Sequence, residues 1–327
     1  MKPPFYDAAD VERLLDYPGC IAAMRDAMRS LSQAGRAQPL RQIVKVSDHV
    51  LFGVMPGDLA AAGSLGAGSF GAKLVSVAED PARPGRSRHR GVVVAYDAGT
   101  GEITCLADAE AVTSIRTACA TAAATDVLAR ADAEVLAIFG TGTQAEAHLR
   151  ALRHVRAFRR ILLWGRSPES AAALAARLSA ELDLPIVPAA GARQAAQEAD
   201  VICTVTGSSE PVLLGEWVKA GTHVNLVGSS MLGPVEADTA LVARARYIAD
   251  YRPGALAQAS ELAVARDAGV VTDAHVAGEI GDVFAGKLTG RENADQVTLY
   301  KSLGHVVQDL AAAAYLDARA LREGTGS

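Results

Sequence analysis

Three small residues with the spacing G-x-G-x-x-A, Gly140, Gly142 and Ala145, could bind a charged ligand. The apolar run 135–139 precedes them, as expected of a buried strand, and apolar residues recur at helical spacing after them. In such a strand, turn and helix, the first glycine makes the tight turn and the second lets the backbone approach a pyrophosphate. The helix N-terminus faces the negative charge. Because strand and helix flank the glycines, the segment predicts a dinucleotide site rather than a bare turn.

Two cations stand among apolar residues and could bind an anionic substrate. Lys73 shares one face of a predicted strand with Val75 and Val77, and Arg116 lies within a helical region. On sequence alone, such a lysine more often lays its alkyl chain along the sheet and reaches water with its charge. An arginine on a helix is usually solvated. Contact with a ligand is the alternative for both residues.

The second strand of the predicted nucleotide-binding region ends in Trp164-Gly165-Arg166-Ser167. A site that prefers NAD usually offers an acidic residue to the ribose hydroxyls at this point. Arg166 and Ser167 suit a 2′-phosphate better, so the pair favours NADP(H) over NAD(H). Stacking of the arginine on adenine is the alternative.

The elements that must position these residues fall into two groups. Six apolar segments alternate with alanine-rich helical segments, which predicts a Rossmann-type, doubly wound parallel sheet in an α/β fold: 135–139, 161–164, 185–187, 201–205, 223–227 and 246–249. Ligands of such sheets bind beyond the carboxyl ends of the strands, here at Thr204-Val205-Thr206 and Val227-Gly228-Ser229-Ser230. Before residue 110, short alternating segments predict an α+β domain with a meander: 41–46, 51–55, 70–77, 91–96 and 102–107. The last helix is expected to return to this domain.

Composition excludes several classes of protein. The chain has 327 residues, 50% hydrophobic and 21% charged, which is ordinary for a folded protein of two domains. Its net charge of −5 and its scattered basic residues argue against nucleic acid or acidic membranes as partners. The four cysteines are far apart, without metal-ligand spacing, so we expect free thiols, no metal and a reducing cytoplasm. Neither a signal peptide nor a membrane span is expected.

Eight short motifs in one order resemble the ornithine cyclodeaminase and mu-crystallin family over nearly the whole chain. They are Pro39-Leu40-Arg41, Met55-Pro56-Gly57, Gly71-Ala72-Lys73-Leu74-Val75-Ser76, His89-Arg90-Gly91, Ser114-Ile115-Arg116-Thr117, Gly140-Thr141-Gly142-Thr143-Gln144-Ala145, Val224-Asn225-Leu226-Val227-Gly228 and Lys301-Ser302-Leu303-Gly304. The resemblance implies a homodimer with a substrate-binding and dimerisation domain, residues 1–122 and 304–327. A nicotinamide-binding domain, residues 123–303, is implied between them.

The resemblance also assigns roles to residues. Arg41, Lys73 and Arg116 match positions that hold the substrate carboxylate beside the nicotinamide, which weakens the solvated readings of the two cations. The other substrate positions implied are Met55, His89 and Ser230. The glycine turn, the ends of the predicted strands and the motifs together predict the cofactor positions Thr117, Gly140, Thr141, Gly142, Thr143, Gln144, Arg166, Ser167, Thr204, Val205, Val227, Gly228, Ser229, Lys301 and Ser302.

Two positions separate the chemistries of this family. Ornithine cyclodeaminases resemble this chain but carry an acidic residue just before Met-Pro and an aspartate after the Val-Gly stretch, where this sequence has Gly53 and Ser230. Without both carboxylates, holding a second amine and moving a proton is disfavoured. The cations Arg41, Lys45, Lys73, His89, Arg90 and Arg116 come from segments that the resemblance places around the pocket, and few acidic residues share those segments. Such an excess of cations suits a substrate with two carboxylates.

We therefore expect NAD(P)H-dependent reduction of a small 2-imino acid to an amino acid, with iminosuccinate to aspartate as one example. Lys73 or a water would supply the proton. An amino-acid dehydrogenase, a cyclodeaminase using bound NAD and a non-catalytic ligand-binding protein stay open as alternatives.

Overall fold

The computed structural model describes residues 3–60, 68–78 and 89–324 and divides into two compact units. Unit 1 consists of Met1–Thr117 and His305–Ser327, and unit 2 of Ala118–Gly304. Helix α3 (Ala109–Leu128) contains the first change of unit. The sequence had suggested changes after residues 122 and 303, a few residues from these positions.

Unit 1 is built on a mixed sheet with the strand order β1-β6-β5-β4-β3-β2. The short β1 runs parallel to β6, and the other neighbours are antiparallel. The strands are β1 (Phe5–Tyr6), β2 (Gln42–Ser47), β3 (Val50–Leu59), β4 (Ser69–Ala78), β5 (His89–Asp97) and β6 (Ile103–Asp108). The meander expected from the alternating segments is therefore present. In β6 the alternation of side chains buries Cys105 and Ala107 and leaves their neighbours more open.

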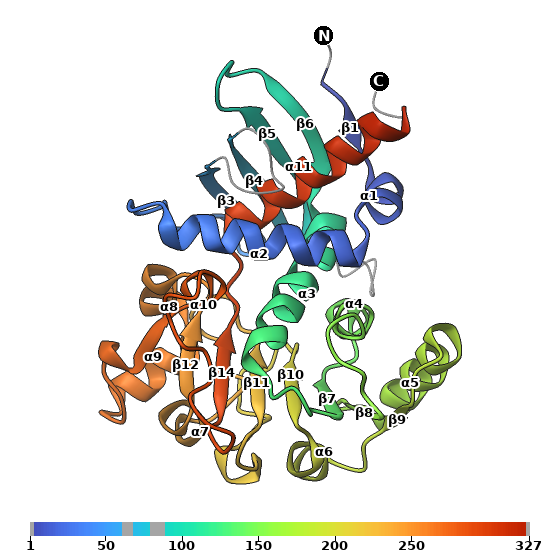
Figure 1. Cartoon of the computed structure of the whole chain (residues 1–327), viewed down its shortest axis with the longest axis vertical. Coiled ribbons are helices and arrows are strands. Elements are labelled where there is room, and N and C mark those ends of the chain that lie inside the picture. Colours follow the sequence, from blue (N-terminus) through green and yellow to red (C-terminus); the bar gives the residue numbers. More distant parts are fainter. Residues whose placement is uncertain (1–2, 61–67, 79–88, 325–327) are drawn as a thin grey trace. The chain divides into compact units, whose positions relative to one another are not determined.

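Among the described residues of unit 1, three further helices occur: α1 (Ala8–Leu14), α2 (Tyr17–Gln33) and α11 (Val306–Glu323). Figure 1 shows the red α11 crossing the strands of this sheet, and its contacts include β3, β4, β5, β6 and α2. Val306, Leu310 and Ala313 recur at helical spacing and are buried. The last helix of the chain thus covers one face of a sheet made by its first third.

Unit 2 contains, over the described residues, an eight-stranded parallel sheet with the order β13-β12-β14-β11-β10-β7-β8-β9. The strands are β7 (Val135–Phe139), β8 (Arg160–Trp164), β9 (Ile186–Pro188), β10 (Val201–Thr204), β11 (His223–Leu226), β12 (Arg246–Ala249), β13 (Val276–Glu279) and β14 (Thr298–Lys301). From β7 the chain adds β8 and β9 on one side, then crosses to β10 on the other. The predicted doubly wound α/β fold is confirmed, and the switch point lies between β7 and β10.

The helices of unit 2 connect these strands. They are α4 (Thr143–Leu152), α5 (Pro168–Leu182), α6 (Ala192–Glu198), α7 (Thr239–Arg244), α8 (Arg252–Gln258), α9 (Ser260–Asp267) and α10 (Ile280–Phe284), with 3-10 turns at Gly215–Trp217 and Asp273–His275. Local signals fix several starts: Ser167 caps α5 by accepting from the Ser170 amide, and Pro168 occupies the first turn.

Two strands of this sheet, β13 and β14, are additional to the six that the sequence predicted. β13 is only Val-Ala-Gly-Glu, and β14 is Thr-Leu-Tyr-Lys, ending in a lysine that has no solvent exposure. A charge and a glycine break the apolar run by which buried strands are recognised. Both strands are held by their places in the sheet, β14 between β11 and β12 and β13 beside β12.

Candidate substrate and cofactor sites

A buried cluster of two cations and one carboxylate lies in unit 1. The Asp309 Oδ1 atom accepts from Arg116 Nε at 2.9 Å and from Lys73 Nζ at 3.3 Å. The Lys73 ammonium also donates to Thr113 Oγ1 at 3.3 Å. Gln308, beside Asp309, accepts from Arg116 Nη1 at 2.7 Å. Neither cation reaches water, so the interpretation of Lys73 and Arg116 as solvated side chains is wrong.

Three elements bring this cluster together. Lys73 lies in β4, paired with Met55 of β3 and Val93 of β5, and all three side chains are buried. Because α11 packs on these strands, Asp309 in its first turn meets the lysine. Arg116 comes from α3. The sheet thus supplies an amine, and two helices supply the guanidinium and the carboxylate.

Burial and neighbouring charges set the protonation of the cluster. Burial lowers the pKa of Lys73 to about 8; Arg116 and Arg41 lower it as well, and Asp309 opposes them. Burial alone would raise the pKa of Asp309, but Arg116 and Lys73 hold it below its usual value. An amine with a pKa near neutrality can both give and take a proton under ordinary conditions.

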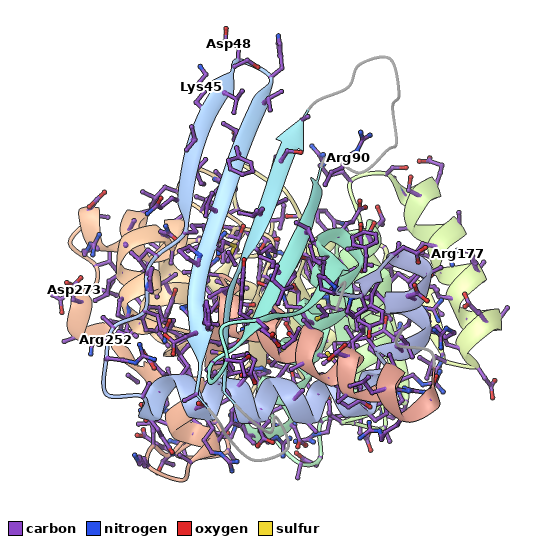
Figure 2. The ribbon with its side chains drawn as sticks, turned by 90° about the horizontal axis from the view of Figure 1, so that it is seen from above. Lys45, Asp48, Arg90, Arg177, Arg252 and Asp273 are labelled. Carbon is purple, nitrogen blue, oxygen red and sulfur yellow. The ribbon has the colours of Figure 1, made fainter. Side chains whose placement is uncertain are left out.

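The other predicted substrate residues of unit 1 have different surroundings. Arg41 is half-buried just before β2 and acts electrostatically on Lys73, whereas Met55 is buried. His89 begins β5, but its side chain lies outside the described residues. Figure 2 shows Lys45 and Asp48 at the end of the β2–β3 hairpin, where their charges pair at 2.7 Å, and Arg90 is exposed. Lys45 and Arg90 therefore do not join the buried cluster.

Unit 2 has a cavity of about 550 Å³ at the carboxyl ends of its central strands. Its position at the switch point between β7 and β10 is where doubly wound sheets bind ligands. The walls come from four chain segments: Gly140–Gly142, Trp164–Ser167, Val205–Ser208 and Val212. The predicted residues Gly140, Thr141, Gly142, Arg166, Ser167 and Val205 thus border one space.

The glycine turn of this cavity fits a dinucleotide. Gly140 has φ +134°, and a Cβ there would lie 2.9 Å from Val205 atoms, so only glycine is accommodated. A Cβ on Gly142 would meet no atom of the described residues within 4 Å, and Gly142 caps α4 without a side chain. The first amides of α4 therefore have no side-chain acceptor there. Such a helix start beside an open cavity suits a pyrophosphate.

Two further residues of the first turn of α4 were predicted to bind the cofactor. Thr143 is exposed, and Gln144 is partly buried. The Gln144 Oε1 atom is buried and accepts no hydrogen bond from the described residues. His148 in the next turn contacts the Gln144 carbonyl at 2.7 Å, and burial lowers its pKa to about 4, so the helix start carries no histidine charge at neutral pH.

A second buried carboxylate, Glu236, organises the loops that follow β10 and β11. It accepts from the amides of Thr206, Gly228 and Ser229 at 2.6, 2.7 and 3.3 Å. The hydroxyls of Thr204 and Thr206 donate to it, each at 2.8 Å. The predicted cofactor residues Thr204, Gly228 and Ser229 are thus held by this carboxylate, and the loop after β10 continues into the cavity wall.

The remaining predicted residues are also mostly buried. Lys301 has no solvent exposure and pairs with Glu261 at 2.8 Å, whereas the buried Ser302 Oγ lacks a hydrogen-bond partner among the described residues. Val227 and Thr117 are buried as well, and Ser230 is half-buried after β11. Their predicted roles as ligand contacts stay predictions.

Comparison with known proteins assigns the chain to a protein family. The family model "Ornithine cyclodeaminase/mu-crystallin family" matches residues 1–324. The chain belongs to this family. Ketimine reductase mu-crystallin of Mus musculus is 31% identical over 316 residues, which is 95% of each chain.

Two solved structures of this family are similar over nearly their whole length. The delta(1)-pyrroline-2-carboxylate reductase of Thermococcus litoralis, in complex with NADH and L-proline, is 29% identical with a TM-score of 0.92 and 99% of each chain covered. The iminosuccinate reductase of Paracoccus denitrificans, in complex with NAD⁺, is 28% identical with a TM-score of 0.91, covering 99% of this chain and 98% of the other. These relatives group the chain with NAD(P)-dependent oxidoreductases that act on CH–NH groups.

Three residues around the sites were not identified from the family motifs: Gln308, Asp309 and Glu236. A signal existed for Asp309, because it lies three residues after Val306 and beside Leu310, on the face of the helix that the apolar pattern assigns to the core. A carboxylate on such a face requires a buried cation. For Glu236 the sequence offers no comparable signal, since it follows Pro234-Val235 in a segment without helix or strand periodicity.

Within the part of the chain that the structure describes, no group of three or more histidine, cysteine, aspartate or glutamate side chains could hold a metal ion. None of the helices found in those residues has the length and apolar character needed to span a bilayer.

Proposed function

We propose that this protein reduces a small 2-imino acid to the corresponding amino acid with NAD(P)H. The observation that carries the proposal is the buried pair Lys73 and Arg116, held on one carboxylate in unit 1. Such a pair supplies a guanidinium for a substrate carboxylate and an ammonium for proton transfer. The cavity and glycine turn of unit 2 support a nicotinamide cofactor.

Each group has a defined task in this reaction. The bound nicotinamide supplies a hydride to the imine carbon. Arg116, with Arg41, binds the substrate carboxylate and orients the imine. Lys73 gives a proton to the nitrogen as the carbon–nitrogen double bond becomes single. Its pKa of about 8 makes the ammonium available at neutral pH and still acidic enough to transfer.

A dicarboxylic substrate is favoured by the charges near this cluster. Lys73 and Arg116 share the single carboxylate of Asp309, so this buried group carries more positive than negative charge. Arg41 adds to the positive potential at Lys73. A positive excess of this kind favours a substrate with more than one carboxylate. Iminosuccinate has this composition, and the 28% identical Paracoccus denitrificans enzyme is named for it.

Cyclodeamination of ornithine is disfavoured by two positions. A Cβ added to Gly53 would lie 3.1 Å from Val75 Cγ1, so an acidic side chain there would have to displace Val75. After β11 the chain has Ser230, which cannot act as a carboxylate base. Neither position supplies the charge that would hold a second amine or move a proton.

The coenzyme preference depends on Arg166. Ser167, the other candidate for a 2′-phosphate, already donates to Glu169 Oε2 at 2.9 Å and accepts from the Ser170 amide. Arg166 borders the cavity and is exposed. We therefore propose that the protein binds either coenzyme, and that Arg166 makes the affinity for NADP(H) higher than the affinity for NAD(H).

A panel of substrates tests the proposed function. Glyoxylate, pyruvate and oxaloacetate are each offered with ammonia or methylamine, Δ1-pyrroline-2-carboxylate is offered alone, and NAD(P)H absorbance is followed. L-ornithine with NAD⁺ is tested separately for proline. We expect reduction of the imines, fastest with oxaloacetate, and no appreciable proline. Proline formation at rates comparable to imine reduction would contradict the proposal. A preference for pyruvate or the cyclic imine would contradict only the proposed dicarboxylic substrate.

The protein is further proposed to be a homodimer that joins through the sheet of unit 1. β2 forms the edge of this sheet and exposes Ile43, Val44 and Val46 by 45%, 53% and 64%. An apolar edge strand tends to pair or be covered. Sedimentation should give about twice the 33.8 kDa of one chain, and a single-chain mass would contradict the dimer.

A further inference from the structure

Asp309 is a fully buried carboxylate, and burial of a charge has to be offset. Removing a carboxylate from water costs several kcal/mol unless cations and hydrogen bonds compensate it. Asp309 has no solvent exposure, and its neighbours in the helix, Val306 and Leu310, are apolar and buried. Its charge therefore depends on the two cations that reach it from β4 and α3.

The hydrogen bonds to Asp309 are unevenly distributed. Both cations bind Oδ1, whereas Oδ2 accepts no hydrogen bond from the described residues although it is buried. In an ion pair that only stabilises the fold, both oxygens would normally be satisfied. Arg116 has a second acceptor in Gln308, whereas the other partner of Lys73 is the neutral Thr113 hydroxyl. Asp309 is thus the anion that the lysine contacts.

The groups that face Lys73 otherwise disfavour its charge. Arg116 from α3 and Arg41 from the segment before β2 both repel an ammonium, and burial acts in the same direction. On α11, burial lowers the pKa of His305 to about 4, so this residue adds no charge at neutral pH; Asp58 of β3 acts on His305. Asp309 alone among these groups favours the protonated lysine.

We propose that Asp309 is a positioning residue that keeps Lys73 protonated and oriented for proton transfer to the imine nitrogen. The proposal rests on the proposed function. As the imine carbon accepts a hydride and a C–H bond forms, the electron pair of the C=N bond moves to nitrogen. The nitrogen takes a proton from Lys73 Nζ, whose N–H bond breaks. The resulting neutral amine stays beside Asp309 and is protonated again from water.

The pH dependence of kcat for imine reduction tests this role in Asp309→Asn. The acid form of Lys73 is required, so the wild-type rate should hold at low pH and fall above about pH 8. Without the carboxylate, the pKa of Lys73 decreases, and the fall should begin about 1 pH unit lower or more. Coenzyme affinity, measured by fluorescence titration, should not change. Asp309→Glu restores the charge and should return the fall toward its wild-type position.

Asp317→Asn is the matched control, because it removes another carboxylate of α11, one that accepts from the Tyr6 hydroxyl at 2.8 Å. Its pH profile should be that of the wild type. If Asp309→Asn lowers thermal stability but leaves the profile unchanged, Asp309 is merely structural and the inference is wrong. If Asp309→Asn does not fold, Lys73→Arg decides: this variant should lose the fall near pH 8, and its persistence would overturn the inference. A wild-type protein that reduces no imino acid would instead refute the proposed function.

Discussion

The two units each bury a carboxylate next to a proposed ligand site, but the hydrogen bonds to the two carboxylates differ in kind. Glu236 of unit 2 receives five hydrogen bonds from backbone amides and hydroxyls, spread over both oxygens. From the described residues, Asp309 of unit 1 accepts two hydrogen bonds, both from cations and both on one oxygen. The hydrogen bonds to Glu236 hold the loops after β10 and β11 in place. Asp309 instead places a negative charge next to Lys73, whose protonation can change.

This difference extends to the way each unit can bind an anion. Unit 2 offers a helix start, a glycine turn and backbone amides, whose partial charges do not titrate. Unit 1 offers side-chain cations, whose charge depends on burial and on each other. A unit that must only hold a cofactor can use fixed dipoles, but a unit that must move a proton needs a titratable group. Side-chain and backbone substitutions should therefore separate the two functions.

The largest effect is expected from Gly142→Val, which tests whether unit 2 binds by its backbone. The added side chain would occupy the open space beside the cavity, so coenzyme binding should be abolished by steric exclusion. The fold should persist, because φ at Gly142 is −94° and a Cβ meets no atom there. Fluorescence titration with NADH and NADPH, together with circular dichroism, measures both.

Gly191→Val is the control for this substitution. Gly191 is also a helix N-cap without a side-chain cap and with no atom near its Cβ position, but it does not line the cavity. It should retain coenzyme affinity. Unchanged affinity in Gly142→Val would mean that the glycine turn does not contact the cofactor.

The next effect in size is that of Arg116→Met, which tests whether unit 1 binds its anion by side chains. Loss of a charged donor to the substrate carboxylate should weaken transition-state binding by about 3 kcal/mol, which lowers kcat/KM roughly a hundredfold. Coenzyme affinity should change much less. Arg13→Met, which removes an exposed arginine of the same unit, should leave kcat/KM unchanged. Parallel losses of coenzyme affinity and kcat/KM in Arg116→Met would remove the division of tasks between the units.

The smallest effect concerns Arg166, the place where unit 2 would add a side-chain charge to its backbone site. Arg166→Ala should weaken the binding of NADPH by about 1 to 3 kcal/mol, because a charged hydrogen bond is lost. The binding of NADH should weaken much less. Dissociation constants for both coenzymes measure this. Equal losses would indicate stacking on adenine instead.

The strand and helix alternation of unit 2, its glycine turn and the meander of unit 1 could all be predicted from the sequence. These are local properties, because strand runs, turn glycines and helix periods depend on residues close in the chain. Gly140 illustrates this: its spacing predicted a tight turn, and its backbone has φ +134°. The family motifs also singled out Lys73 and Arg116 before their surroundings were known.

The surroundings of those cations could not be predicted, because they depend on packing between elements that are distant in the chain. Asp309 is 236 residues from Lys73 in the chain, and it reaches the lysine because α11 packs on β3 and β4. Glu236 likewise accepts from the hydroxyls of Thr204 and Thr206, about thirty residues earlier, and no local sequence pattern predicts this contact. The strand β14, with its buried lysine, forms because Glu261 pairs with Lys301 and neighbouring strands complete its hydrogen bonds. Burial makes a charge depend on its partners, and those partners are set by packing rather than by position along the chain.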